Sequence, residues 1–249
     1  MSVRFTRAIV VGASSGIGAA IAVELGREGA AVALLARRTA ELAAVAQAVE
    51  QAGGRALSYP HDVTDYDSVP GLLERIEGDL GGLDLVVYAA GVMPEVAEGE
   101  YDFGKDRRMI EVNLLGAMAW FDLAAARFEA RRAGTLVGIS SIAGERGRRG
   151  MPGYTTSKAA LTVYLEALRN RVARYGVNVV TAKPGFVDTA MTRGKKGLFW
   201  VVSPRAAAAR ILALARRGSG ASGFVPARWG LVALVVRSIP SFLFRRLNI

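Results

Sequence analysis

The chain has 249 residues, of which 51% are hydrophobic, and it contains no cysteine. This is enough material for one sizeable core, it excludes disulfide bonds, and no uninterrupted apolar stretch reaches the roughly 18 residues of a transmembrane helix. The net charge is +10, yet all 22 acidic residues lie at or before Asp188, so the basic excess falls in the last quarter of the chain. Because the first apolar run already predicts a strand, we expect no cleavable signal peptide and a cytoplasmic protein.

Residues 4–11 predict a strand that leads directly into the glycine-rich sequence G-A-S-S-G-I-G, and a helical pattern follows. Glycines at such a turn let the backbone approach a pyrophosphate, and the helix N-terminus offers unpaired N–H groups to the phosphates. A plain strand-to-helix turn is the alternative. We favour a dinucleotide site, and the motif assigns to it Gly12, Ser14, Ser15, Gly16, Ile17 and Gly18.

The second predicted strand, residues 31–36, ends in Arg37 and Arg38, and no acidic residue stands between Gly29 and Glu41. An acidic side chain here would bind the ribose 2′-hydroxyl of NAD, whereas an arginine suits the 2′-phosphate of NADP. The pattern therefore favours NADP(H) over NAD. The alternative is that the two arginines are a solvated pair in a loop.

Helical stretches alternate with five further strand-like runs, near residues 55–60, 83–88, 134–139, 176–182 and 222–226. This alternation predicts an α/β fold, a Rossmann-type doubly wound parallel sheet of about seven strands with helices on both faces. No linker or repeat divides the chain, so we expect a single domain. Residues 1–226 would form the dinucleotide-binding and catalytic part, with a substrate lid at about 189–204, and residues 227–249 a basic, apolar C-terminal extension.

Tyr154 and Lys158 stand four residues apart in Y-T-T-S-K, and Ser141 lies thirteen residues before the tyrosine. On a helix, side chains at i and i+4 share one face and can interact. A neighbouring ammonium lowers the pKa of a phenol, which is ordinarily about 10, and a serine hydroxyl beside it could hold a carbonyl oxygen. The trio fits an acid/base site for interconverting an alcohol and a ketone, although the spacing alone also fits a surface helix pair.

Together these motifs resemble those of the short-chain dehydrogenase/reductase family, and the resemblance covers nearly the whole chain. The coenzyme loop is followed in the family's order by H-D-V-T at 61–64, Y-A-A-G at 88–91, N-L-L-G at 113–116, I-S-S-I-A-G at 139–144 and P-G at 184–185. Y-A-A-G replaces the usual N-N-A-G, and Val11 stands where a threonine is common. The resemblance implies that the coenzyme also contacts Asp62, Val63, Ala90, Gly91, Tyr154, Lys158, Pro184, Gly185, Val187 and Thr189.

The resemblance also implies a mechanism. Hydride passes between NADP(H) and the carbonyl carbon, Tyr154 exchanges the proton, and Ser141 hydrogen-bonds the oxygen. Lys158 lowers the pKa of the tyrosine and contacts the nicotinamide ribose, and Asn113 resembles the family's relay asparagine, which would hold a water between Lys158 and solvent. His61, the only histidine, is expected to be a loop residue rather than a base, and no metal site is expected. The competing hypothesis is a nucleotide-binding regulator without turnover, which would have no chemical need for these four polar residues.

The C-terminal extension combines apolar runs with Arg237, Arg245 and Arg246 and holds no acidic residue. Aromatic and basic side chains on an apolar segment are typical of interfacial membrane anchors, and Pro240 would split a continuous helix in two. Two interpretations stay open: the extension contacts an anionic membrane from the cytoplasmic side, where recruitment could even be the main function, or it packs on the pocket or a neighbouring subunit. No recognised motif supports a nucleic-acid partner.

The predicted lid carries apolar side chains at 198–200 and basic ones at Arg193, Lys195 and Lys196. Met93 and Met151 are candidates for the opposite wall. These residues suggest a small hydrophobic carbonyl or alcohol substrate, including one on an anionic carrier. In the family, the helices predicted near 106–131 and 153–175 usually build an interface, so the resemblance implies a homodimer or homotetramer.

Overall fold

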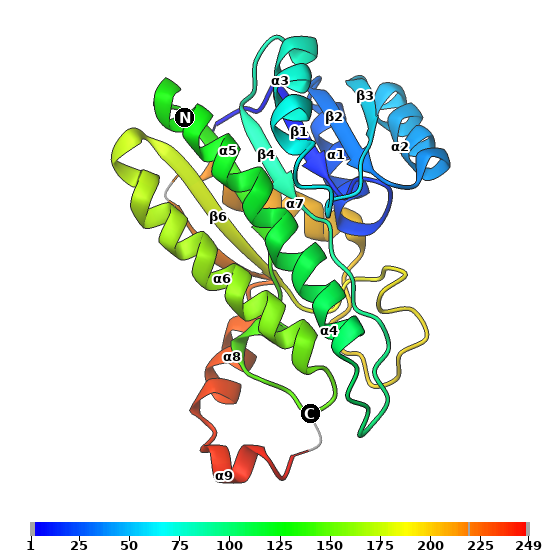
Figure 1. Ribbon diagram of the computed structural model, residues 1–249, viewed down its shortest axis with the longest axis vertical. Coiled ribbons are helices and arrows are strands. Elements are labelled where there is room, and N and C mark those ends of the chain that lie inside the picture. Colours follow the sequence, from blue (N-terminus) through cyan, green and yellow to red (C-terminus); the bar gives the residue numbers. More distant parts are fainter. Residues whose placement is uncertain (1–2, 219, 248–249) are drawn as a thin grey trace.

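Seven parallel strands form one sheet in the computed structural model, which describes residues 3–218 and 220–247 (Figure 1). The order across the sheet is β3-β2-β1-β4-β5-β6-β7. The strands are β1 (Arg7–Val11), β2 (Ala31–Ala36), β3 (Arg55–Pro60), β4 (Leu85–Tyr88), β5 (Gly134–Ile139), β6 (Val177–Pro184) and β7 (Ser222–Val225). The predicted fold class is thus confirmed, and the strands lie within a few residues of the runs that the sequence indicates.

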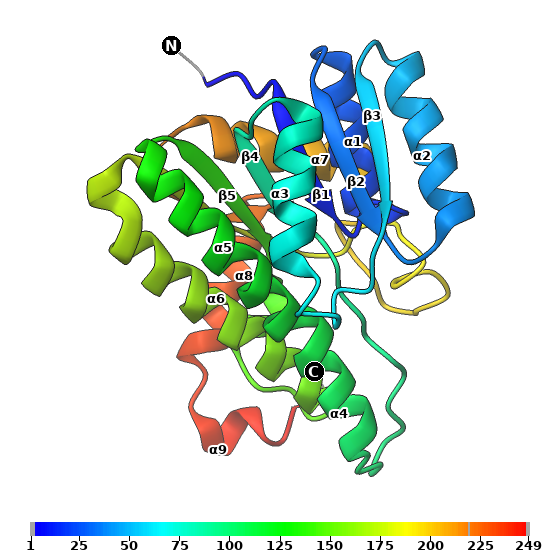
Figure 2. The ribbon, with the colours of Figure 1, turned by 45° about the horizontal axis from the view of Figure 1, so that its top comes forward.

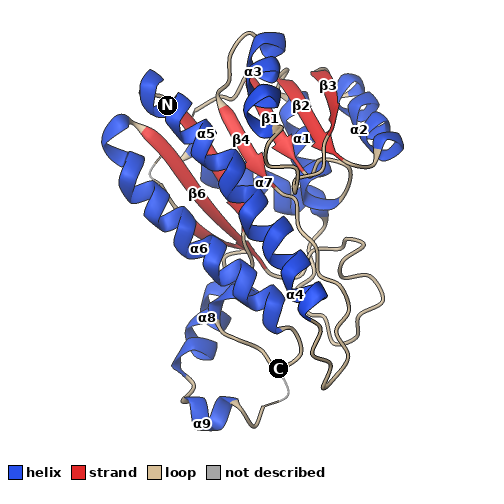
Figure 3. Ribbon diagram, in the orientation of Figure 1, coloured by secondary structure: helices blue, strands red, loops and turns tan. Residues whose placement is uncertain are grey.

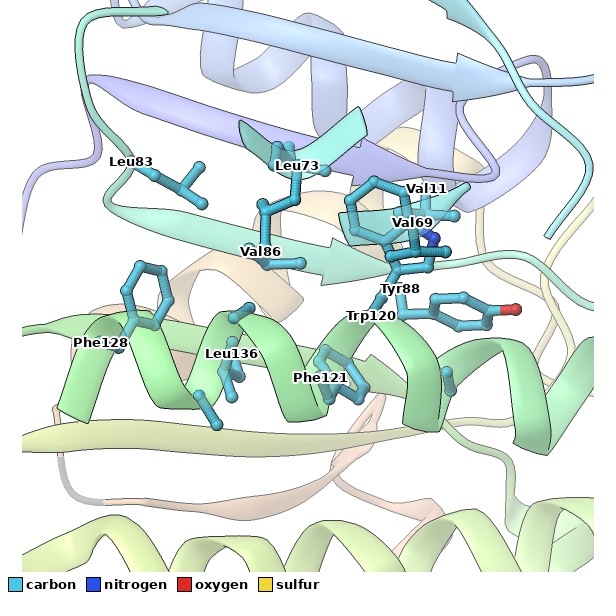
Figure 4. Packing of buried hydrophobic residues seen from close by; sticks show 14 of the residues in the cluster. Val11, Val69, Leu73, Leu83, Val86, Tyr88, Trp120, Phe121, Phe128 and Leu136 are labelled. Atoms are coloured by element: carbon cyan, nitrogen blue, oxygen red, sulfur yellow. The ribbon is translucent and has the colours of Figure 1, made fainter. Parts of the chain in front are cut away.

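Helices cover both faces of the sheet, which is why most strands are apolar along their whole length (Figure 3). Helices α1 (Gly16–Arg27), α2 (Thr39–Gln51) and α7 (Pro204–Arg216) lie on one face. The other face carries α3 (Val69–Leu80), α5 (Gly116–Arg131) and α6 (Pro152–Val172). Figure 4 shows the core on this second face, where Trp120, Phe121 and Phe128 of α5 pack over Val86 and Leu136 of the central strands.

Helix α4 (Phe103–Ile110) runs into α5 through one π-helical turn, Glu111–Leu115. Among the described residues, this continuous run from Phe103 to Arg131 is the one helix long and apolar enough to cross a bilayer, but half of its apolar window is buried in the fold. Trp120 and Phe121 are fully buried against the sheet. The run therefore acts as a core helix here.

The C-terminal extension forms two short helices, α8 (Trp229–Ser238) and α9 (Ser241–Phe244), separated at Ile239 and Pro240 as the proline predicts. Helix α8 packs beside the edge strand β7, and α9 lies further out, beyond one end of α6 (Figure 1 and Figure 2). Only the inner side of α8 is buried, at Trp229 and Ala233. The segment between β6 and α7, which includes the predicted lid, is irregular apart from one bridge between Val187 and Val202.

Candidate active site

The main cavity lies at the carboxyl ends of the strands, where β1 pairs with β2 on one side and β4 on the other. The strand order reverses between β1 and β4, and open α/β sheets bind ligands at such a point. The cavity has a volume of about 420 Å³, within the range of small-molecule sites. All the predicted site residues line it except Gly18 and Asn113, which lie just behind its wall.

The glycine-rich loop has a backbone that larger residues could not adopt. Gly12 has φ +85°, and a Cβ there would come within 2.4 Å of the Ala90 nitrogen. A Cβ on Gly18 would lie 2.2 Å from the Gly12 carbonyl oxygen, so a glycine at position 18 lets the first turn of α1 pack directly against the loop. Helix α1 starts at Gly16, and its N-cap residue Ser15 makes no side-chain cap hydrogen bond. The first N–H groups of the helix thus keep their capacity to bind phosphate oxygens.

The two arginines after β2 lie beside this loop. Arg38 Nη2 donates hydrogen bonds to Ser14 Oγ at 2.9 Å and Ser15 Oγ at 2.7 Å. Arg37 Nη1 lies 3.5 Å from Asp62 Oδ2. Both guanidiniums line the cavity and are about half exposed. They therefore place positive charge at the end of the cavity where a dinucleotide anchored on the glycine loop would carry its adenosine ribose.

Tyr154, Lys158 and Ser141 converge on the other end of the cavity. Ser141 follows β5, while Tyr154 and Lys158 share one face of α6, and all three residues are at least 92% buried. Lys158 Nζ donates to the Ile139 carbonyl oxygen at 2.9 Å and lies 5.9 Å from the centre of the Tyr154 ring. The neighbouring Ser140 turns away and bonds the Lys158 carbonyl oxygen at 2.9 Å. Its hydroxyl thus ties α6 to β5, whereas Ser141 Oγ accepts from the Ala143 backbone nitrogen at 3.1 Å and lines the cavity with Tyr154.

The electrostatics of this end combine burial with two cationic side chains, Lys158 and Arg148. Burial raises the pKa of the Tyr154 phenol, and the hydrogen bond with Ser141 and the charge of Arg148 oppose that rise. Lys158, expected to lower this pKa, is itself buried, and its own pKa falls to about 8. Because Lys158 lies close to the phenol, its expected effect on Tyr154 stays a prediction. Arg148 is a second cationic group that favours the phenolate, and the sequence did not indicate it.

Asn113 is fully buried in the π-helical turn between α4 and α5. Its Oδ1 accepts from the Val92 backbone nitrogen at 2.7 Å, and its Nδ2 donates to the Val92 oxygen and to Ser157 Oγ, each at 3.0 Å. A Cβ on Gly91 would meet Asn113 Oδ1 at 3.4 Å and Lys158 Nζ at 3.5 Å, so both groups border the same small space. The π-helical turn, which is wider than an α-helical one, thus positions the Asn113 side chain next to Gly91 and Lys158.

His61 lies in the loop after β3, as expected, and it is 93% buried. Trp120 Nε1 donates to its Nε2 at 3.3 Å. Burial lowers the pKa of the imidazole, which keeps it neutral at physiological pH. Together with the ring of Trp120, which stands edge-on to it at 5.6 Å, it packs as a core residue.

The substrate end depends on contacts that no sequence motif signals. The Trp229 ring of α8 packs directly on Gly185, where a Cβ would lie 2.0 Å from Trp229 Nε1. It also joins an aromatic cluster with Phe186, Phe199 and Trp200. The extension is thus in contact with the lid and with the segment predicted to hold the nicotinamide.

A buried ion network fixes the extension further. The Glu145 carboxylate, a few residues after Ser141, lies 2.8 Å from Lys183 Nζ, and both side chains are almost fully buried. Arg237 of α8 pairs with the other carboxylate oxygen. Arg146 donates to the Val236 carbonyl oxygen at 2.8 Å, at the end of the same helix. These residues are far apart in the chain, so their association emerges only from the fold.

Comparison with known proteins identifies relatives of this chain. A sequence model of the family described as short chain dehydrogenase matches residues 6–197. The chain is 38% identical over 189 residues to the cis-4-hydroxycyclohexanecarboxylate dehydrogenase of Sinomonas cyclohexanicum, a match that covers 75% of each chain. A short-chain type dehydrogenase/reductase from Mycobacterium marinum has a similar structure, with a TM-score of 0.81 at 28% identity over 88% of this chain and 93% of that one. One from Mycobacterium ulcerans covers 99% of this chain and 100% of its own, with a TM-score of 0.84 at 23% identity, and shows a shared fold.

The chain therefore belongs to the short-chain dehydrogenase/reductase family. Members of this family are oxidoreductases that use a nicotinamide coenzyme, act on small substrates and commonly oligomerise.

Proposed function

We propose that this protein is an NADP(H)-dependent oxidoreductase that interconverts a ketone and a secondary alcohol on a hydrophobic substrate. One observation carries the proposal: Ser141, Tyr154 and Lys158 line the same cavity as the glycine-rich loop. The relative whose name gives a hydroxycyclohexanecarboxylate as its substrate also acts on a secondary alcohol. The apolar wall residues Met93, Met151 and Phe186 favour a hydrophobic substrate body.

The residues around the cavity fit the coenzyme along its whole length. The free N–H groups at the start of α1 suit its phosphates, Arg38 suits a 2′-phosphate, and Lys158 and Thr189 border the end where the nicotinamide would lie. NADP(H) would supply or accept the hydride at the carbonyl carbon. The absence of an acidic side chain after β2 and the pairing of Arg38 with two serines favour the phosphorylated coenzyme.

The chain's own groups manage the proton. Because burial raises its pKa, Tyr154 is protonated at neutral pH and can donate to the oxygen of a reduced carbonyl. Ser141 holds that oxygen, and Lys158, with a pKa of about 8, returns a proton to the tyrosine. The space shared by Lys158 Nζ and Asn113 Oδ1 suits a water that connects the lysine to solvent.

Replacing Tyr154 by phenylalanine tests this assignment. Loss of the proton donor is expected to lower kcat by about 10²- to 10⁴-fold while NADPH still binds. The matched control is Tyr164→Phe on the same helix, whose hydroxyl instead bonds Asp122 at 2.8 Å. A Tyr154→Phe variant with near-native turnover would contradict the proposal, and NADPH binding without turnover of any ketone by the wild type would favour a nucleotide-binding regulator.

We also propose that the extension touches an anionic membrane surface, with the enzyme cytoplasmic. Leu231, Leu234 and Phe242 are 68%, 63% and 58% exposed, and the basic residues Arg245 and Arg246, which follow Phe242 closely in the chain, are exposed too. This combination of exposed apolar side chains and positive charge complements an anionic bilayer. Because α8 buries only one side, the fold itself leaves this face outward.

Vesicle sedimentation separates the two interpretations of that face. The wild type should sediment with phosphatidylglycerol vesicles at low salt and much less with phosphatidylcholine, and a Leu231→Glu/Leu234→Glu variant should stay in solution. Val163→Glu, at a position 66% exposed on α6, is the matched control. Absence of sedimentation at low salt would reject the membrane contact, and loss of an oligomer in the double variant would assign the face to a subunit contact.

We further propose a homodimer or homotetramer built through the helices α4, α5 and α6. Phe103 and Val163 on these helices are 79% and 66% exposed, which is unusual for large apolar side chains on long helices. Light scattering at micromolar protein concentration measures the molar mass and so tests the oligomeric state.

A further inference from the structure

Arg148 lies among apolar side chains at the end of the cavity that also holds Tyr154. This end is lined by Val92, Met93, Ile142, Ala143, Met151, Phe186 and Met191. Tyr154 packs there with Met109 and Ala143, so the proton donor itself lies in apolar surroundings. Arg148 belongs to the loop between β5 and α6 and lines the same cavity, partly buried. A guanidinium in such a place loses much of its hydration and gains from an anionic partner.

Within residues 3–218 and 220–247, no carboxylate lies within ion-pair distance of Arg148, and its guanidinium makes no side-chain hydrogen bond. Its two neighbours in the loop are engaged elsewhere. Arg146 binds backbone carbonyls at the end of α8, with 2.8 Å to the Val236 oxygen, and Arg149 lies 3.5 Å from Glu98. Three arginines thus stand close together in sequence, and Arg148 is the one that faces the cavity.

The cavity offers Arg148 no acidic partner at its own end. Asp62 is the one carboxylate among the described lining residues, and it lies at the coenzyme end. There it is 3.5 Å from Arg37 and 3.8 Å from Arg108. Arg148 and Tyr154 line the same cavity, and the charge of Arg148 opposes the burial that raises the pKa of the Tyr154 phenol. An anion bound to Arg148 would therefore lie in the same end of the cavity as the carbonyl that the enzyme reduces.

We infer that Arg148 binds a carboxylate of the substrate, and that the substrates of this site are oxo acids and the corresponding hydroxy acids with an apolar body. The inference rests on the proposed function of the site. A planar guanidinium matches a carboxylate with two parallel N–H···O bonds. A single half-buried arginine among methionines balances one negative charge. Lys195, whose Nζ lies 3.9 Å from Met93 Sδ at the edge of the cavity, adds positive charge where an acid would enter.

Binding of matched acids and amides tests the inference without requiring turnover. The probes are 2-oxo-2-phenylacetate, 3-acetylbenzoate and 4-acetylbenzoate, each against its primary amide, titrated by calorimetry into the full-length protein saturated with NADP⁺. The wild type should bind at least one acid about ten- to a hundredfold more tightly than its amide, the range expected for a hydrogen bond to a charged group. Arg148→Gln should abolish this preference for the acid. Arg149→Gln, which removes the neighbouring exposed arginine, should preserve it.

The kinetic counterpart separates substrate binding from an effect on the tyrosine. Arg148→Gln should lower kcat/KM for the acid about ten- to a hundredfold more than that for its amide, because any effect on Tyr154 is shared by both substrates. A wild type that prefers none of the acids, or a preference that survives in Arg148→Gln, overturns the inference even when neutral ketones are reduced. Failure of the proposed function has a different signature, namely no ketone reduced at all, and an acid preference in the binding data would still support the Arg148 subsite.

Discussion

The coenzyme end of the cavity and the C-terminal extension beside its substrate end are built in different ways. The coenzyme end comes from β1, α1 and β2, which follow one another in the chain, and its contacts join neighbouring segments, as in the 2.7 Å bond from Arg38 to Ser15. The extension is held by partners far away in sequence. Glu145 binds Arg237, and Gly185 accommodates the ring of Trp229.

The distribution of charge shows the same contrast. Along the sequence the basic excess of the last quarter has no acidic counterpart, but in space several of these cations pair with the first half of the chain. Arg205 lies 3.0 Å from Glu24, and Arg216 pairs with Glu28. A charge count along a sequence therefore overstates how much positive charge is left for an external partner. Arg245 and Arg246 at the end of the extension belong to the part that stays exposed, together with Arg193, Lys195, Lys196, Arg210, Arg217 and Arg228.

The largest expected effect comes from removing the extension after Pro226. A separate module could be cut off without harm, whereas here the cut removes a fully buried tryptophan and leaves Glu145 with Lys183 alone. We expect the shortened chain to fail to fold, or to lose more than about 5 kcal/mol in its free energy of unfolding, since removal of one buried tryptophan side chain costs about 3–5 kcal/mol. Urea denaturation followed by circular dichroism measures this.

Two point variants on α8 keep the test informative if the shortened chain does not express. Trp229→Ala should lower the free energy of unfolding by about 3–5 kcal/mol. Leu234→Ala, at a position 63% exposed, should change it by less than about 0.5 kcal/mol. Equal stabilities for the wild type and Trp229→Ala would mean that the extension is independent of the catalytic fold.

This contrast also explains what sequence could predict. The sequence predicts the strands, the glycine-rich turn and the shared helix face of Tyr154 and Lys158. Each of these depends on local periodicity or on a local backbone requirement, such as the positive φ of Gly12. The ion network of Glu145 could not be predicted, because its partners, Lys183 and Arg237, meet only once β6 and α8 are in place. The place of Arg148 beside the tyrosine could not be predicted for a related reason: spacing along a helix indicates which residues are neighbours, but not which loop residue will line the same cavity.

The next effect in size concerns the choice of coenzyme. Arg38→Ala should weaken NADPH binding about ten- to a hundredfold and leave NADH binding nearly unchanged, since a guanidinium recognises the 2′-phosphate that only NADPH carries. Arg37→Ala should have a smaller effect, because Arg38 is the arginine that bonds Ser14 and Ser15 of the glycine-rich loop. Fluorescence titration of both coenzymes with all three proteins measures the ratio. A wild type that binds NADH more tightly than NADPH would contradict the assignment.

The smallest expected effect is a pH dependence that belongs to the catalytic end alone. Burial lowers the pKa of Lys158 to about 8, whereas a lysine in an unfolded chain titrates near 10.4. Between these values the unfolded chain binds more protons than the folded one, so this residue makes the free energy of unfolding rise with pH across that window. Below pH 8 Lys158 is protonated in both the folded and the unfolded chain, so the full cost of burying its charge remains.

Relative to Lys158→Met, the free energy of unfolding of the coenzyme-free wild type should rise by about 2 kcal/mol between pH 7 and pH 9.5. Lys196→Met, at an exposed position of the lid, should run parallel to the wild type in the same urea titrations. Parallel curves for Lys158→Met as well would show that the buried lysine keeps its ordinary pKa, and that an internal charge or water compensates its burial.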